Sequence, residues 1–196
     1  PGQERGDSLL VVWLHGADMV EISPAEIKQV HCRFRLRTYF FVPQNPKPTP
    51  DGHKFDWGVS YCKAQNENGL GFIYGHPHMD FLDAITQQIA STQQWLGTAR
   101  AYVMGYSMGG FGAYQLAAHR PTLFDAAVSI AGYGQGTLEP QSDSGSKAPQ
   151  PQASNIFRAW CDSFCPRLAL LRNLIVIHAP KDRLSSFLDA KAIVER

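Results

Sequence analysis

The segment Gly105-Tyr106-Ser107-Met108-Gly109 has the residue types of a serine nucleophile held on a tight turn. It follows a short apolar run, Ala101–Met104, and opens a helix-like stretch, Met108–His119. A chain that passes so abruptly from strand to helix needs glycine two residues before and two residues after the serine, because side chains there would collide. The turn lifts the Ser107 hydroxyl out of the sheet and sets the Met108 N–H and the helix N-terminus beside it, where negative charge is favoured. This pattern predicts attack on an acyl carbonyl.

Glycine-rich turns between a strand and a helix also occur in nucleotide-binding folds, which is the main alternative for this segment. Those folds use G-x-G-x-x-G or G-x-x-x-x-G-K-[ST], whose backbone N–H groups surround phosphates. Neither pattern occurs around Gly105–Gly110. We therefore interpret the turn as a nucleophile elbow.

The elements that must position this turn are visible as apolar runs and helical patterns. The apolar runs are continuous rather than alternating, which is typical of parallel strands; they are Leu9–Leu14, Arg37–Val42, Ala101–Met104, Phe124–Ala131 and Leu174–Ile177. Helices are expected at Asp80–Trp95, Met108–His119, Ile156–Arg172 with an interruption at Pro166, and Ser186–Arg196. Strands that alternate with helices predict an α/β fold, with a mostly parallel sheet and helices on both faces.

Two segments between these elements lack a regular pattern. The first, from Gln44 to about Pro77, is rich in Pro, Gly, Asn and aromatic residues, and we expect a long irregular loop. The second, from about residue 132 to residue 153, is poor in apolar residues, and we expect a flexible insert. The aromatic side chains of the first segment either line a substrate pocket or pack the loop onto the body; they are Phe55, Trp57, Tyr61, Phe72 and Tyr74.

Three stretches together resemble the α/β-hydrolase superfamily, in particular its carboxylesterase, acyl-protein thioesterase and dienelactone hydrolase branch. Val12–Gly16 resembles the end of the family's third strand with its His-Gly oxyanion loop, and Gly105–Gly112 resembles the elbow. Leu174–Asp182 resembles the strand-seven segment, with Ala179 in place of the usual glycine. The stretches are in family order and span nearly the whole chain. The resemblance implies an α/β-hydrolase fold that lacks its last strand and the loop with the catalytic histidine.

The resemblance implies a role for each matching residue. Ser107 would be the nucleophile, and Asp182 would orient the catalytic histidine and stabilise its charge. The backbone N–H groups of Met108 and Ala17 would form the oxyanion hole, in a loop shaped by Gly16. From the residues alone, Asp182 could instead be a surface residue that caps the following helix.

The histidine of the family's triad has no counterpart in this sequence. The family places it beyond the helix that follows the acid, and no histidine lies after His178. His15 and His178 match positions that support turns, so we expect structural roles for both. His76 and His78 fall in the long loop at the edge of the sheet, where either could contact substrate or substitute as the base. The His76-Pro77-His78 pair has no third ligand for a metal.

Composition narrows the remaining function classes. Lys and Arg number 18 and Asp and Glu number 17, which gives a net charge of +1. The sequence therefore lacks the excess of positive charge that is typical of nucleic-acid-binding proteins. Apolar runs are too short to cross a bilayer, and no secretory signal opens the sequence, so a soluble cytoplasmic protein is the default expectation. No C-x-x-C pair occurs, and Cys161 and Cys165 are expected as reduced thiols on one helix face. No cofactor or metal is implied.

We therefore predict a serine hydrolase that cleaves a carboxylic ester or thioester of small or medium size through an acyl-enzyme on Ser107. A peptidase would use the same residues. The alternative is a catalytically inactive hydrolase-like domain, a pseudoenzyme that serves as a binding or structural subunit of a larger assembly with protein partners. We expect one domain over residues 1–196, truncated at both ends, because Pro1 opens the sequence and its last residues stop within a helical pattern.

Overall fold

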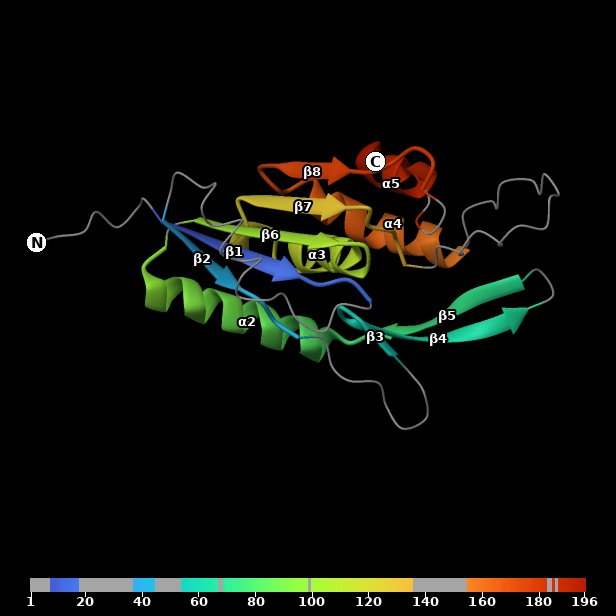
Figure 1. Cartoon of the computed structure of the whole chain (residues 1–196), viewed down its shortest axis with the longest axis horizontal. Helices are drawn as coiled ribbons and strands as arrows, with labels where there is room; N and C mark the ends of the chain where they lie inside the picture. Colours follow the sequence, from blue (N-terminus) through green and yellow to red (C-terminus); the bar gives the residue numbers. More distant parts are fainter. Residues whose placement is uncertain are drawn as a thin grey trace, which may run out of the picture.

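A five-stranded parallel sheet forms the centre of the molecule (Figure 1). The computed structural model describes residues 8–17, 37–44, 54–66, 69–98, 100–135, 155–182, 185 and 187–196. The strand order across the sheet is β2 (Arg37–Phe41), β1 (Ser8–Leu14), β6 (Arg100–Tyr106), β7 (Ala126–Ile130) and β8 (Leu174–Ile177). Each neighbouring pair is parallel. The predicted α/β class is confirmed, and this sheet is parallel throughout rather than only in its main part.

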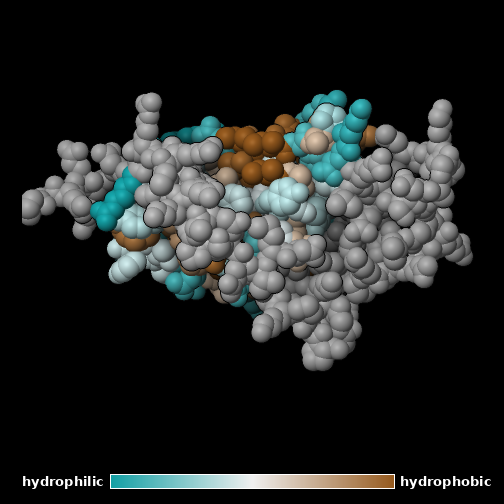
Figure 2. All heavy atoms as spheres, viewed as in Figure 1, coloured by the Kyte–Doolittle hydropathy of each residue, from teal (hydrophilic) through white to brown (hydrophobic). Residues whose placement is uncertain are grey.

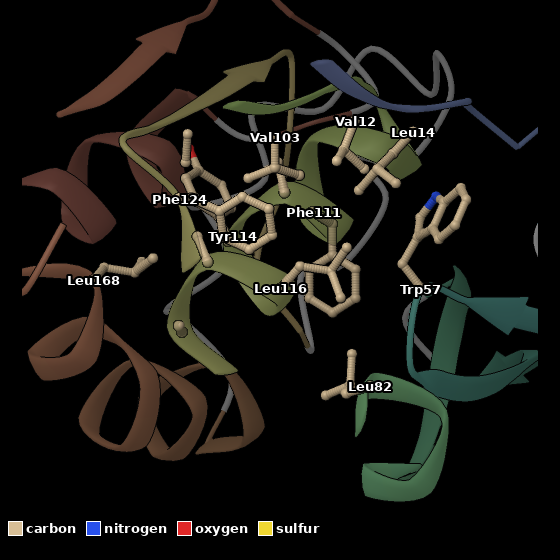
Figure 3. Close-up of a cluster of buried hydrophobic side chains, with 14 of the residues drawn as sticks. Val12, Leu14, Trp57, Leu82, Val103, Phe111, Tyr114, Leu116, Phe124 and Leu168 are labelled. Atoms are coloured by element: carbon tan, nitrogen blue, oxygen red, sulfur yellow. The ribbon is translucent and has the colours of Figure 1, made fainter. Parts of the chain in front are cut away.

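Helices cover one face of this sheet, and the hydrophobic core lies between the two layers. The helices are α2 (Met79–Leu96), α3 (Met108–His119), α4 (Asn155–Leu168) and α5 (Phe187–Val194), with a short 3-10 turn at Pro121–Leu123. α3 lies centrally behind β1, β6 and β7 (Figure 1), and every one of its residues is buried. Phe111, Tyr114 and Leu116 of α3 belong to one buried cluster with the strand residues Val12 and Val103 (Figure 3), and the rings of Phe111 and Tyr114 also contact Trp160 of α4. The elbow helix is thereby held on both of its sides.

The second face of the sheet carries no helix from the described residues, so the expectation of helices on both faces is met on one face only. On β8, Leu174 and Val176 contact the core under the helices, whereas Ile175 and Ile177 are about half exposed. The two isoleucines pair in register with Val128 and Ile130 of β7. Figure 2 shows the apolar surface at this place. A continuous apolar strand predicts two apolar faces, but it does not say which segment covers each of them.

A second, antiparallel sheet occupies most of the segment that we expected to be an irregular loop. Its strands are β3 (Lys54–Asp56), β4 (Val59–Asn66) and β5 (Gly69–Pro77), in that order. The prediction was wrong because glycine, asparagine and proline mark turns but also occur within strands and at their ends, as Gly69, Gly71 and Pro77 do in β5. The predicted insert at 132–153 lies outside the described residues beyond residue 135.

The other predicted elements are confirmed with small changes at their ends. α3 and β8 have the predicted bounds, and α2, β6, β7 and α5 differ by a few residues. Pro166 lies inside the last turn of α4 instead of interrupting it. Cys161 and Cys165 are free and buried on that helix. Within the described residues no helix is long and apolar enough to cross a bilayer.

Candidate active site

The predicted site residues gather where the connections of the sheet diverge. Because β1, β6, β7 and β8 are parallel, the loops that follow them leave the sheet at one edge. The chain passes from β1 outward to β2 and then returns to β6 on the other side of β1. Open α/β sheets bind their ligands at such a reversal. His15–Ala17 follow β1 and Ser107 follows β6, so the predicted oxyanion loop and nucleophile flank this point.

Ser107 has the backbone conformation that a nucleophile elbow requires. Its φ of 56° and ψ of −117° lie outside the regions that side chains prefer. Its N–H donates to the Ile130 carbonyl at 2.8 Å, and its carbonyl accepts from the Phe111 N–H in the first turn of α3. A Cβ on Gly105 would lie 2.3 Å from the Gly109 carbonyl oxygen, and one on Gly109 would lie 2.0 Å from the Leu14 carbonyl oxygen. The glycine spacing read from the sequence is therefore a steric requirement, set by the turn itself at Gly105 and by the neighbouring strand β1 at Gly109.

The loop after β1 approaches the nucleophile closely. A Cβ on Gly16 would lie 3.7 Å from the Ser107 Cβ and 3.3 Å from the Tyr106 carbonyl oxygen. His15 is buried, and its Nδ1 lies 2.8 Å from the Gly16 carbonyl oxygen. Ala17 is exposed, and Met108 begins α3 directly after the serine. The two segments predicted to supply the oxyanion donors are brought together, which leaves the donor roles of Ala17 and Met108 as proposals.

The segment after β7 forms a third wall beside Ser107. Ala131 has a φ of 50°, and its N–H donates to the Ile177 carbonyl at 2.8 Å. Among the described residues the non-glycine positions with positive φ are Trp57, Ser107 and Ala131. Strained backbone of this kind concentrates at functional sites. Two of these residues lie at the carboxyl ends of adjacent strands, which supports the assignment of the site to this edge.

Asp182 lies in the loop after β8, where its carboxylate is held by its own segment. One oxygen accepts from the Ser185 N–H at 3.0 Å, and the other lies 3.6 Å from Nε2 of His178. The side chain of His178 is buried, and its Nε2 donates to the Ser185 carbonyl at 3.0 Å. These contacts fit the structural role expected for His178. They also give Asp182 a structural contact within its own loop, to Ser185 two residues before α5 begins, so the alternative that it caps this helix stays open beside the catalytic role.

A hydrogen bond links this loop to the wall beside the nucleophile. The Ser185 hydroxyl donates to the Gly132 carbonyl at 3.0 Å, and the bond is buried. Gly132 in turn packs against α3 so closely that a Cβ on Gly110 would lie 2.7 Å from its Cα. Asp182 is therefore tied through Ser185 and Gly132 to the first turns of the elbow helix.

The two histidines proposed as substitute bases do not lie in an irregular loop. His76 is part of β5, and its side chain lies outside the described part of the chain. His78 is exposed at the N-terminus of α2, and its backbone N–H donates to the Gly58 carbonyl at 2.7 Å. Within the described residues, no hydrogen bond joins a histidine to the Ser107 hydroxyl.

Three residues that the sequence did not single out as a group, Asp56, Trp57 and Tyr133, pack beside the proposed site and are joined to it by hydrogen bonds. Trp57 is fully buried, and its indole N–H donates to the His15 carbonyl at 3.1 Å. Its neighbour Asp56 is also buried and accepts from the Tyr133 hydroxyl at 2.5 Å. Burial raises the pKa of Asp56 well above its ordinary value, and the bond from Tyr133 opposes this only in part. For Trp57 the structure selects packing over pocket lining; the side chains of Phe55, Tyr61, Phe72 and Tyr74 lie outside the described residues.

A separate surface hollow of about 670 Å³ lies at the other end of α3. Its lining includes Asp83 and Arg120, which pair with each other beside His119. Twelve helical residues separate that end from Ser107, which corresponds to roughly 18 Å along the helix axis. The hollow is thus not the acyl site. No group of three His, Cys, Asp or Glu side chains placed to hold a metal occurs among the described residues.

Comparisons with known proteins agree with this fold. The sequence model of the alpha/beta hydrolase fold family matches residues 40–190. Among solved structures the chain is similar to SOBER1 from Arabidopsis thaliana, with 15% identity and a TM-score of 0.58 over 96% of this chain and 81% of that one. Esterase PE8 is similar in fold, with 14% identity and a TM-score of 0.53 over 95% of this chain and 77% of that one. A thermostable esterase is also similar in fold, with 18% identity and a TM-score of 0.52 over 100% of this chain and 44% of that one. No curated protein matches. Because the family match covers well over half of its residues, the chain belongs to the α/β-hydrolase fold family.

Proposed function

We propose that the protein is a serine hydrolase that cleaves carboxylic esters or thioesters of small or medium size through an acyl-enzyme on Ser107. The observation that carries this proposal is the strained backbone of Ser107, at the start of a buried helix and against the Gly16 loop. A fold maintains such strain only where the surroundings over-determine it, and a purely structural strand-to-helix turn has no need of it.

The chemistry follows from this placement. The Ser107 oxygen attacks the acyl carbonyl carbon while a base takes the hydroxyl proton, and the carbonyl oxygen becomes an oxyanion. The N–H groups of Met108 and Ala17 stabilise that charge. The tetrahedral species expels the alcohol or thiol, which receives the proton, and leaves an ester on Ser107. Water then attacks this ester, releases the carboxylic acid and restores the serine.

Asp182 would hold the histidine that acts as the base. It lies on a loop joined through Ser185 to Gly132, at the same sheet edge as the nucleophile. The base is proposed to be a histidine that is not part of this sequence, or else His76 or His78. Two similar structures are of esterases, so hydrolysis of short acyl esters is the first activity to assay.

The competing proposal is a hydrolase-shaped binding or structural module. It is favoured by one observation: within the described residues the Ser107 hydroxyl has no bonded histidine, and a serine without a base is a weak nucleophile at neutral pH.

Covalent labelling distinguishes the two. The protein is incubated with a fluorophosphonate probe, its intact mass is measured, and turnover of p-nitrophenyl acetate and an acyl thioester is followed. A single adduct and turnover that both vanish in Ser107→Ala support the enzyme. Ser163→Ala is the matched control, since Ser163 is exposed on α4 and should change neither result. No adduct with the unaltered protein would favour the module.

A further inference from the structure

Trp57 lies between the end of β1 and the elbow helix, under the oxyanion loop. Figure 3 shows its indole beside Leu14, with the ring nitrogen on the side of β1. The N–H donates to the His15 carbonyl at 3.1 Å, and the indole meets the His15 ring edge-on at 5.0 Å between centroids. On its other side the indole lies against α3, where a Cβ on Gly112 would come within 2.5 Å of the Trp57 Cγ. The tryptophan therefore contacts both halves of the proposed site.

Its hydrogen bond fixes the direction of a peptide plane. The C=O of His15 and the N–H of Gly16 belong to one planar trans unit and point in opposite directions. Holding the His15 carbonyl on the Trp57 N–H therefore determines where the Gly16 N–H points. Because the bond is buried, the loss of its donor costs more than the loss of a donor at the solvent-exposed surface.

The next peptide plane is fixed by His15, which Trp57 also supports. A carbonyl oxygen can only accept, so Nδ1 of His15 carries the proton in its 2.8 Å bond to the Gly16 carbonyl. That carbonyl shares a plane with the Ala17 N–H, the proposed oxyanion donor. The His15 ring is restrained by the Trp57 edge contact. Two successive peptide planes of the oxyanion loop thus depend on one indole.

The neighbouring residue connects this support to the other wall of the site. Asp56, one residue before Trp57, accepts from the Tyr133 hydroxyl, and the Tyr133 ring stacks on Phe111 at 5.5 Å. Tyr133 lies two residues after Ala131, beside the nucleophile. The φ of 37° at Trp57 shows that its backbone is strained, and it is held by contacts on both sides.

We propose that Trp57 is a positioning residue that orients the oxyanion loop His15–Ala17 through its indole N–H, with Asp56 and Tyr133 fixing Trp57 relative to Ser107. This inference rests on the proposed hydrolase function. Oxyanion donors act because they are already aligned before charge develops, so a misaligned loop should lower kcat and leave substrate binding nearly unchanged.

The test removes the N–H while it keeps the shape of the ring. β-(3-Benzothienyl)alanine, in which sulfur replaces the indole nitrogen, is incorporated at position 57, and Trp57→Phe is made as a second variant. The same analogue at position 95 is the matched control, because Trp95 is 83% exposed on α2. Removal of a whole oxyanion donor costs about 100-fold to 1,000-fold in kcat, so a loosened loop should cost about 10-fold to 100-fold with KM changed less than about threefold.

The outcomes distinguish failure of the positioning role of Trp57 from failure of the proposed hydrolase function. Ser107-dependent turnover with kcat within twofold of the unaltered protein in the folded position-57 analogue overturns the positioning role and leaves the hydrolase intact. Absence of any Ser107-dependent turnover in the unaltered protein overturns the hydrolase. In that case the amide NMR signals of Gly16 and Ala17 test whether Trp57 orients the loop, since these signals should shift with the analogue at position 57 and not with the analogue at position 95. Unchanged signals refute the orientation of the loop by Trp57.

Discussion

The elbow and the antiparallel sheet contribute to the same site in different ways. The elbow is compact in the sequence: Gly105, Ser107 and Gly109 lie within five consecutive residues, a Cβ on Gly105 would collide with the Gly109 carbonyl, and the requirement for glycine at 109 adds contact with Leu14 of β1. Trp57 follows β3 of the second sheet and acts through a bond to a residue 42 positions away and a contact to a helix 55 positions away. The difference teaches that a nucleophile can be encoded locally while the donors around it depend on distant packing.

The largest effect should come from a methyl group inside the elbow. Gly109→Ala would place a Cβ 2.0 Å from the Leu14 carbonyl oxygen, and backbone on both sides leaves no room to yield. We expect a loss of about 3 kcal/mol or more in unfolding free energy, together with loss of fluorophosphonate labelling. Urea unfolding and intact mass measure the two.

Gly97→Ala is the control for that substitution. Gly97 has a φ of 66° but no neighbour within 4 Å of a built Cβ, so only backbone strain applies, at about 1–2 kcal/mol. An equal loss of unfolding free energy in Gly109→Ala and Gly97→Ala would show that the close contacts around Gly109 do not add to the backbone strain.

The next effect concerns Asp182, whose local contact competes with its proposed catalytic role. Asp182→Asn can keep the acceptor for the Ser185 N–H but removes the charge. A triad acid is needed for the tautomer and charge of the histidine, so kcat should fall by about 10³–10⁴-fold while the fold persists. Steady-state kinetics and the thermal midpoint decide; full activity in the variant would reduce Asp182 to a loop cap.

A smaller effect is expected from the buried carboxyl group beside Trp57. The native pKa of Asp56 is raised by burial, so the stability associated with the protonated form is complete below the unfolded pKa of about 3.9 and is lost as pH rises through the native pKa. The unfolding free energy should therefore decline as pH increases above about 4. Asp56→Asn keeps an acceptor for Tyr133 and should flatten this decline. Urea unfolding between pH 4 and pH 8 measures it, and a parallel decline in the variant would contradict the prediction.

The smallest effect, of opposite sign, lies at the far end of α3. Asp83 has its pKa lowered, mainly by the hydrogen bond to His119, with Arg120 adding to it. Its contribution to stability is present above the unfolded pKa of about 3.9 and is lost as pH falls through the lowered native pKa. Solvent screens this half-exposed carboxylate. Asp83→Asn should slightly weaken the acid dependence of unfolding below about pH 4 and leave labelling of Ser107 unchanged. A changed labelling rate would couple the two ends of α3.

Local patterns were sufficient for much of the fold. The glycines around Ser107 predicted the turn, and the apolar pattern that follows, with Pro121 beyond its end, predicted the bounds of α3, because both signals lie in neighbouring residues. The apolar run Leu174–Ile177 predicted β8 with its bounds. The prediction for the segment 54–77 was wrong because β5 contains glycines and ends on a proline, residue types that also mark loops, and the pairing of β5 with β4 is not visible in the residues of either strand alone.

Sequence alone determined that this chain presents a serine on a strained turn between a strand and a helix, and it placed Gly16 and Asp182 on loops of the same fold. It did so because steric conflicts within a turn and the periodicity of strands and helices are properties of neighbouring residues. Only the tertiary structure decided that Trp57 holds the His15 carbonyl and that Asp56 meets Tyr133. Those contacts join residues 42 and 77 positions apart, and such pairs form only where the sheet and α3 bring their elements together.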